Sequence, residues 1–168
     1  RDIDLSHLRV AISGGETIDA DAFDKFLEAT APFGFDRSAA APAYGMAESA
    51  CAVTMPAVGE GVHYDEVTVT PPGGGEPIRR RYAILGKPLG GMQVPIVEPN
   101  VDVPVIDGRN VGHVEIRGAS MMRGYLGDAD LGAGEWFSTG DLGYLIDDRL
   151  VICGRAKEVI IVAGRNLF

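Results

Sequence analysis

The sequence has few of the residues that mark several common classes of protein. Only 15 of its 168 residues are Lys or Arg, against 24 Asp or Glu, which gives a formal net charge of −9 at pH 7. This balance argues against a general nucleic-acid binder and a polybasic membrane-surface protein, because both need clustered basic side chains. No apolar run approaches the roughly 18 residues of a membrane span, and no signal-peptide pattern opens the chain. We therefore expect no nucleic-acid partner and no membrane span.

Cysteine, histidine and the standard active-site motifs are equally scarce. The two cysteines, Cys51 and Cys153, lie far apart in apolar surroundings, which predicts buried free thiols in a reducing, cytoplasmic compartment. The 3 histidines have no zinc-ligand spacing. The chain has no P-loop, no G-x-G-x-x-G after a strand and no serine in a nucleophile elbow. Common zinc, P-loop and serine-hydrolase sites are therefore not indicated.

What the chain does contain is a globular composition with many turn formers. Hydrophobic residues make up 46% and charged residues 23%, with 23 Gly and 10 Pro. These values are typical of a folded, loop-rich and partly β chain of about one domain. The chain begins at Arg1 rather than Met and ends at Phe168 directly after an apolar run. We expect it to be a piece of a larger protein.

The first 60 residues predict part of an α/β layer. An apolar run at 8–13 predicts a strand, and apolar positions at helical spacing then predict a helix with Asp19 as N-cap and Pro32 as its stop. A second buried strand is expected at 39–44, followed by a short helical stretch around Glu48. Strand, helix and strand in this order favour a parallel arrangement.

The remainder of the chain has a different pattern. From 61 to 154, short alternating or apolar runs are separated by Gly and Pro clusters, which predicts a small β-rich, barrel-like subdomain. Within it, Arg79–Arg81 is interpreted as a solvated loop. One more strand is expected at 159–164. The predicted fold class is mixed α/β, with 1–60 in the α/β layer, the β-rich subdomain at 61–154, and a last segment at 155–168.

Three segments are too specific in composition for generic turns. They are Tyr-Gly-Met-Ala-Glu at 44–48, preceded by Ser-Gly-Gly-Glu at 13–16; Ser-Thr-Gly-Asp-Leu-Gly-Tyr at 138–144; and Gly-Arg-Ala-Lys-Glu, ending in Gly-Arg-Asn, at 154–166. In this order and spacing they closely resemble the adenylate-forming superfamily. That superfamily includes acyl-CoA synthetases, fatty acyl-AMP ligases and the adenylation domains of peptide synthetases. The resemblance covers nearly the whole chain.

The resemblance implies an enzyme that joins a carboxylate to ATP with Mg²⁺, releases pyrophosphate and passes the acyl group to a thiol. It implies that Tyr44 stacks on adenine, that Glu48 holds the metal ion, and that Asp141, in a turn after Gly140, accepts the ribose hydroxyls. Arg155 would reach the ribose or the α-phosphate, and Lys157 would lie at the hinge of a small C-terminal domain, with 155–168 as the start of that domain. The resemblance assigns further nucleotide-pocket positions to Gly14, Gly15, Glu16, Gly45 and Met46.

Taken singly, these residues have ordinary structural interpretations. Tyr44 would be a core aromatic residue, Asp141 an Asx-turn residue, Glu48 a charge at a helix N-terminus, and Lys157 a solvated strand residue. Their joint occurrence, in order, favours the functional interpretation.

The branch of the superfamily depends on fewer positions. Ala47, where many members have Ser or Thr, and the final Gly-Arg-Asn at 164–166 look most like fatty acyl-AMP ligases, which pass a fatty acyl group to the pantetheine thiol of a carrier protein. A fatty-acid–CoA ligase, with coenzyme A as acceptor, is the alternative. A non-catalytic binding module is a third interpretation.

The superfamily's phosphate loop and catalytic lysine have no counterpart within these residues. By resemblance, the loop should precede Arg1 and the lysine should follow Phe168. We therefore expect residues 1–168 alone not to adenylate an acid, because the lysine stabilises charge on the reacting groups.

Overall fold

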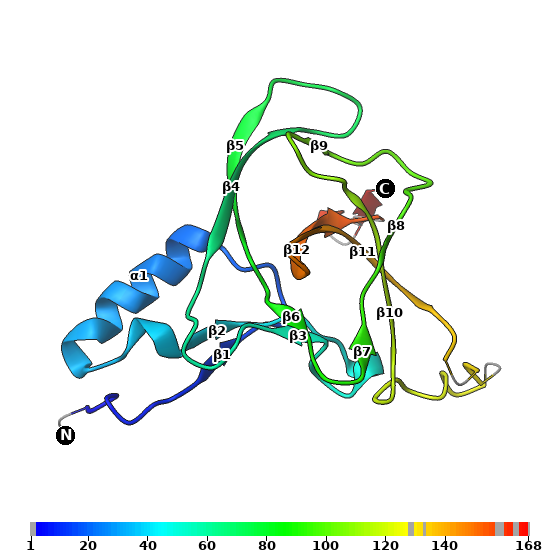
Figure 1. The fold of residues 1–168 in the computed structure, drawn as a ribbon. Coiled ribbons are helices and arrows are strands. Elements are labelled where there is room, and N and C mark those ends of the chain that lie inside the picture. Colours follow the sequence, from blue (N-terminus) through cyan, green and yellow to red (C-terminus); the bar gives the residue numbers. More distant parts are fainter. Residues whose placement is uncertain (1–2, 128–129, 133, 157–159, 163–164, 168) are drawn as a thin grey trace.

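The computed structural model describes residues 3–127, 130–132, 134–156, 160–162 and 165–167. One α-helix lies beside a curled arrangement of short strands (Figure 1). The predicted mixed α/β class is confirmed.

The N-terminal part is the expected α/β layer. Strand β1 (Ala11–Ser13) pairs in parallel with β2 (Ala40–Pro42), and helix α1 (Ala20–Thr30) connects them. The predicted N-cap is confirmed, because Asp19 Oδ1 accepts a hydrogen bond of 2.7 Å from the backbone N–H of Ala22. A small core lies between the helix and the following chain, formed by Leu27, Phe35, Ala39 and Ala40. Single-turn 3₁₀ helices cover Ala31–Phe33, Arg37–Ala39 and Ala47–Ser49.

The β-rich part contains two main sheets. One has the order β5-β4-β9, and the other has the order β12-β11-β10-β7 with β8 also paired to β10. Their strands are β4 (Tyr64–Thr70), β5 (Ile78–Ala83), β7 (Met92–Gln93), β8 (Ile96–Val97), β9 (Val105–Ile106), β10 (Gly112–Gly118), β11 (Phe137–Ile146) and β12 (Arg149–Arg155). All pairings within these two sheets are antiparallel.

Short links join these sheets to each other and to the N-terminal layer. The backbone N–H of Leu85 donates to the carbonyl of Leu150 at 2.8 Å, and Leu150 N–H donates to Gly86 O at 2.9 Å. Strand β3 (Thr54–Met55) pairs with β6 (Lys87–Pro88). The largest cluster of buried apolar side chains in the described part of the chain consists of Val53, Met92, Val94, Val114, Ile116 and Leu150. The expected β-rich architecture is confirmed, and its strands form a curled arrangement (Figure 1).

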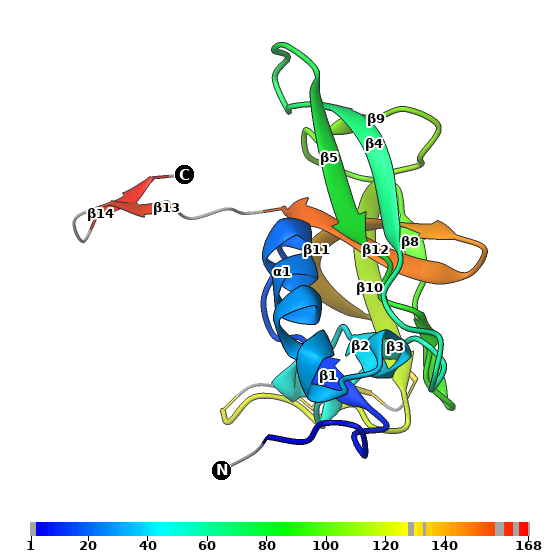
Figure 2. The ribbon, with the colours of Figure 1, turned by 90° about the vertical axis from the view of Figure 1, so that its left-hand side faces the viewer.

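The predicted subdomain limits remain predictions. The β3–β6 pair crosses the limit at residue 60, so the two parts share hydrogen bonds there. Beyond residue 155, β13 (Ile160–Val162) pairs antiparallel with β14 (Arg165–Leu167), a hairpin drawn apart from the main body in Figure 2. The strand expected at 159–164 is therefore present as β13, and its outer residues lie outside the described part.

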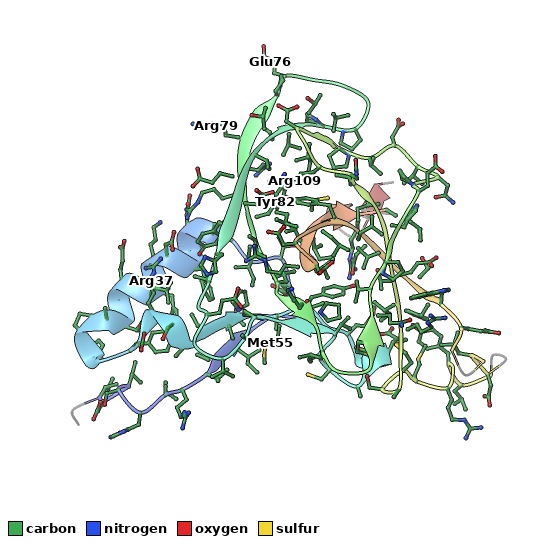
Figure 3. The ribbon with its side chains drawn as sticks, viewed as in Figure 1. Arg37, Met55, Glu76, Arg79, Tyr82 and Arg109 are labelled. Atoms are coloured by element: carbon green, nitrogen blue, oxygen red, sulfur yellow. The ribbon has the colours of Figure 1, made fainter. Side chains whose placement is uncertain are left out.

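Two predictions about surface and burial were wrong. Cys51 is exposed, and Cys153 is half-buried, although both thiols are free as expected. Burial raises the pKa of the Cys153 thiol to about 12. Arg79–Arg81 does not form a loop but lies on β5, and Figure 3 shows Arg79 on the outer side of that strand. Among the described residues, no helix is both long and apolar enough to cross a membrane.

Candidate functional site

The floor of the site is formed where the two parallel strands of the N-terminal layer end. Their carboxyl ends meet at one edge, and Ala43 N–H donates to Ser13 O at 2.8 Å just beyond them. A side chain at Gly14 would place its Cβ 2.6 Å from the Ala43 carbonyl oxygen. Gly14 is therefore needed for this close approach of the two backbones. Such an edge is where ligands bind in many α/β sheets.

Tyr44 follows β2 and is held by its own backbone. Its N–H donates to Thr54 O at 3.1 Å, and its carbonyl accepts from the N–H groups of Val53 and Thr54. The intervening residues form a tight loop, in which a Cβ at Gly45 would lie 1.7 Å from the Cys51 carbonyl oxygen. These constraints fix the direction in which the phenol leaves the backbone.

Asp141 lies on β11, opposite this loop. The register of β11 with β10 shifts between His113 and Glu115, so that residues 139–141 face a single residue, Val114. Thr139 Oγ1 donates to Val114 O at 2.8 Å and accepts from the N–H of Asp141 at 3.1 Å. The turn predicted around Asp141 is thus a bulge within a strand, because β10 and β12 continue the pairing on either side.

Tyr44, Asp141 and Arg155 are joined by hydrogen bonds. Tyr44 Oη donates to Asp141 Oδ2 at 2.6 Å, and Arg155 Nε donates to Asp141 Oδ1 at 2.9 Å. The Asp141 side chain is 7% exposed, whereas that of Arg155 is 69% exposed. Burial, and then the bond to Asp141, raises the pKa of Tyr44, so its phenol stays a neutral donor at physiological pH.

These groups line a cavity of about 540 Å³, within the size range of small-molecule sites. The cavity brings together most of the residues predicted for the nucleotide pocket: Gly15, Glu16, Tyr44, Gly45, Met46, Asp141 and Arg155. Gly14 is not among the lining residues. Its role is to allow the close approach to the Ala43 backbone described above.

Glu48 lies in a neighbouring cavity of about 590 Å³. Met46 and Arg155 line both cavities, so the two adjoin. Glu48 Oε1 accepts a hydrogen bond of 2.6 Å from Tyr125 Oη, and this bond lowers the pKa of the carboxyl. The carboxylate is therefore ionised at neutral pH.

The carboxylates that line the second cavity are compatible with a metal ion held mainly by phosphates and waters. No group of three His, Cys, Asp or Glu side chains in the described part of the chain could hold a metal ion. Mg²⁺ is commonly bound by one or two carboxylates together with substrate phosphates and waters, and needs no protein cage. Glu48, which lines the second cavity together with Glu98 and Glu115, fits this mode. The predicted hinge residue Lys157 lies outside the described residues.

Sequence reasoning missed several residues of the site. Tyr82 and Ile152 line the first cavity, and Thr139 and Tyr125 line the second. Figure 3 shows Tyr82 on the inner side of β5. Alternation along β5 predicts that Tyr82 and Ala83 lie on different faces, so it could not have indicated that both line the first cavity.

Comparison with known proteins identifies the family. The profile of the AMP-binding enzymes matches residues 1–126. The chain belongs to the AMP-binding enzyme family. Its relatives in this family include the putative ligase Rv1013 of Mycobacterium tuberculosis, which is 39% identical over 99% of this chain and 32% of the relative. Another is the medium-chain-fatty-acid–[acyl-carrier-protein] ligase JamA of Moorena producens, 34% identical over 98% of this chain and 31% of the relative.

Solved structures of AMP-binding enzymes share the fold. A structure from a study of fatty acyl-adenylate ligases of E. coli and L. pneumophila has a TM-score of 0.78 and 36% identity, over 98% of this chain and 32% of that chain. The adenylation domain of a keto acid-selecting NRPS module, bound to a keto acyl adenylate, has a TM-score of 0.69 and 31% identity, over 98% and 32% of the two chains. The present chain spans about a third of the length of these proteins. The expected membership of the adenylate-forming superfamily is confirmed.

Proposed function

We propose that residues 1–168 form the nucleotide-binding part of an ATP-dependent fatty acyl-AMP ligase. The observation that carries this proposal is the position of Asp141, buried at the cavity wall between the Tyr44 phenol and the Arg155 guanidinium. A carboxylate has about four acceptor positions, and these two donors use one on each oxygen. The remaining positions suit the two hydroxyl donors of a ribose.

In the proposed reaction, an oxygen of the fatty acid carboxylate attacks the α-phosphorus of ATP. The bond between the α- and β-phosphates breaks, and pyrophosphate leaves. A thiolate then attacks the acyl carbonyl carbon, and AMP leaves with the oxygen that joined it to the acyl group. Neither step changes an oxidation state.

The residues of this chain would bind and orient the nucleotide. The ring of Tyr44 would offer an aromatic face for adenine in the cavity that Gly15 also lines, and Asp141 would fix the ribose. Arg155, with its exposed guanidinium, would face the ribose or the α-phosphate. Glu48 would hold Mg²⁺, which offsets the negative charge of the phosphates when bound. Lys157 is proposed as the hinge between the adenylation and thiol-transfer states.

The thiol acceptor is proposed to be the pantetheine of an acyl carrier protein. The carrier-protein ligase named above supports this choice. A relative from Caulobacter vibrioides, named a putative acyl-CoA synthetase and 35% identical over 98% of this chain and 31% of the relative, favours coenzyme A as the second candidate. Acyl transfer by the full-length enzyme to holo carrier protein, measured beside transfer to coenzyme A, separates the two. A cytoplasmic location is part of the same proposal.

Calorimetric titration of the 168-residue chain with a non-hydrolysable acyl-AMP analogue tests the nucleotide site. We expect micromolar binding that Asp141→Ala abolishes and that Asp102→Ala, a change of an exposed aspartate, leaves intact. Absence of binding by the unmodified chain would favour the non-catalytic module. In the same preparation, acid-dependent ATP–pyrophosphate exchange should not exceed the blank, and exchange above it would contradict the expected inactivity of residues 1–168 alone.

A further inference from the structure

One loop segment contacts Glu48 at two separate points. Tyr125 Oη donates to Glu48 Oε1 at 2.6 Å, and the backbone N–H of Met122 donates to the Glu48 carbonyl oxygen at 2.7 Å. The phenol and the glutamate are 77 residues apart in sequence. The same segment therefore holds both the side chain and the backbone of the residue proposed to bind the metal ion.

The segment is itself anchored to the core. Met121 packs against the main apolar cluster, as does Met46, two residues before Glu48. Gly124 and Gly127, on either side of the Tyr125–Leu126 pair, have φ values of 148° and 95°. Residues other than glycine rarely adopt these backbone conformations. The two glycines allow the chain to reverse so that the phenol returns toward Glu48 while Leu126 is fully exposed.

The contact is poorly suited to a purely stabilising role. Tyr125 is 54% exposed, so water competes for the phenol and the net gain to folding is small. A hydrogen bond to one carboxylate oxygen does, however, restrict the rotation of that carboxylate. It leaves the other oxygen for coordination, with the direction of its lone pairs set in advance.

We propose that Tyr125 is a positioning residue that orients the Glu48 carboxylate for coordination of Mg²⁺ beside the nucleotide. This inference rests on the proposed function. In this role Tyr125 contacts neither the nucleotide nor the reacting atoms, and its effect on the metal ion passes through the Glu48 carboxylate.

The test uses the full-length enzyme that contains residues 1–168, with Tyr125→Phe as the variant. The direct readout is the affinity of the enzyme for Mn²⁺ in the presence of α,β-methylene-ATP, measured by electron paramagnetic resonance. The second readout is the Mg²⁺ concentration that gives half-maximal ATP–pyrophosphate exchange. Tyr64→Phe removes a phenol that contacts α1, at Ala20 O and Asp24, and serves as the matched control.

We expect Tyr125→Phe to weaken Mn²⁺ binding and raise the half-saturating Mg²⁺ concentration about fivefold to tenfold. The KM for the fatty acid should stay within a factor of two, and the Tm should move by no more than about 2 °C. Glu48→Gln should weaken metal binding further. The metal affinity of the double variant should equal that of Glu48→Gln, because the proposed effect of Tyr125 on the metal ion passes through this carboxylate.

Two results would overturn the inference. One is Mn²⁺ affinity in Tyr125→Phe equal to that of the unmodified enzyme and of Tyr64→Phe. The other is a double variant in which the two losses multiply. If the unmodified enzyme shows no acid-dependent exchange, the proposed function itself fails and the inference falls with it. Normal exchange with a metal response that only Glu48→Gln changes overturns the inference alone.

Discussion

Two groups of tyrosine, aspartate and arginine in this chain have the same composition and different geometry. In the cavity group, Asp141 accepts one bond from Tyr44 and one from Arg155. In the second group, Asp65 accepts from the phenol of Tyr144 at 2.8 Å and from two nitrogens of Arg109, at 2.9 Å and 2.8 Å. The second arginine therefore binds its carboxylate with two donors, and the first with one.

The two groups also differ in their exposure to solvent. The Arg109 side chain is 30% exposed, against 69% for Arg155, and Tyr144 is 1% exposed and packs in a core cluster. A two-donor arginine over a buried phenol has little freedom to accept a new partner. A single-donor arginine at a cavity wall can turn toward a ligand. The two groups have the same residue types, so the different roles proposed for them depend on donor geometry and exposure.

The largest effect on folding should come from breaking the structural group. Asp65→Ala leaves the buried Tyr144 phenol and the Arg109 guanidinium without their acceptor, and we expect it to lower the free energy of unfolding by about 3 kcal/mol. Urea denaturation measures this loss. Asp102→Ala, on the exposed surface, should change it by less than about 0.5 kcal/mol. A loss below about 1 kcal/mol for Asp65→Ala would mean that the Asp65 group contributes no more to stability than the Asp141 group is expected to.

The next largest effect should separate binding from stability in the cavity group. Asp141→Asn retains an acceptor for Tyr44 but loses the charge, so we expect its affinity for the acyl-AMP analogue to fall about 30-fold, or about 2 kcal/mol. The free energy of unfolding should fall by no more than about 1 kcal/mol. Calorimetric titration and urea denaturation of the same preparation give both values. Unchanged affinity would remove Asp141 from the proposed site.

Removal of Arg109 should lower the free energy of unfolding more than removal of Arg155, but by less than the loss of Asp65 does. Arg109→Met should cost about 1.5 kcal/mol of unfolding free energy, because it leaves the largely buried Asp65 with only the Tyr144 phenol. Arg155→Met should cost less than about 0.5 kcal/mol, because its exposed guanidinium is screened by water. Thermal unfolding of the two variants, side by side, is the measurement. Equal losses would contradict the assignment of different roles.

The smallest effect is a dependence of stability on pH. Bonds from Arg109 lower the pKa of Asp65 below its ordinary value of about 3.9. The stabilisation from Asp65 is therefore complete above that ordinary value and is lost as the pH falls through the lower pKa of the folded state. The difference in unfolding free energy between the unmodified chain and Asp65→Ala should shrink by about 1 kcal/mol between pH 5 and pH 3. If this difference in unfolding free energy did not change with pH, protonation of Asp65 would not be coupled to unfolding.

Local patterns in the sequence were enough to predict the N-terminal layer. The N-cap at Asp19 and the helix that follows depend on residues within a few positions of one another, and the structure confirms both. The parallel pairing of 11–13 with 40–42 follows from the strand–helix–strand order. The residues predicted for a nucleotide pocket came mostly from resemblance and not from such patterns, and the structure gathers most of them around one cavity.

What sequence analysis missed depends on distant partners. The bulge at Asp141 is set by the register with β10, which no local turn rule contains. Arg81 was assigned to a solvated loop, but it donates to Asp24 at 2.8 Å on helix α1, 57 residues away. Cys51 is exposed, and Ala50 and Cys51 adopt positive φ values of 63° and 143°, features that an apolar neighbourhood in sequence does not indicate.

The bond between Tyr44 and Asp141 closes a loop of 97 residues. Neither motif alone can form the cavity, since one wall comes from the end of a parallel strand pair and the other from a bulge of the distant sheet. Peptides that carry only one of these two segments should therefore have no affinity for an adenylate. Because closing so long a loop has a large entropic cost that other contacts must first offset, the cavity should assemble late in folding, when both sheets are already in place.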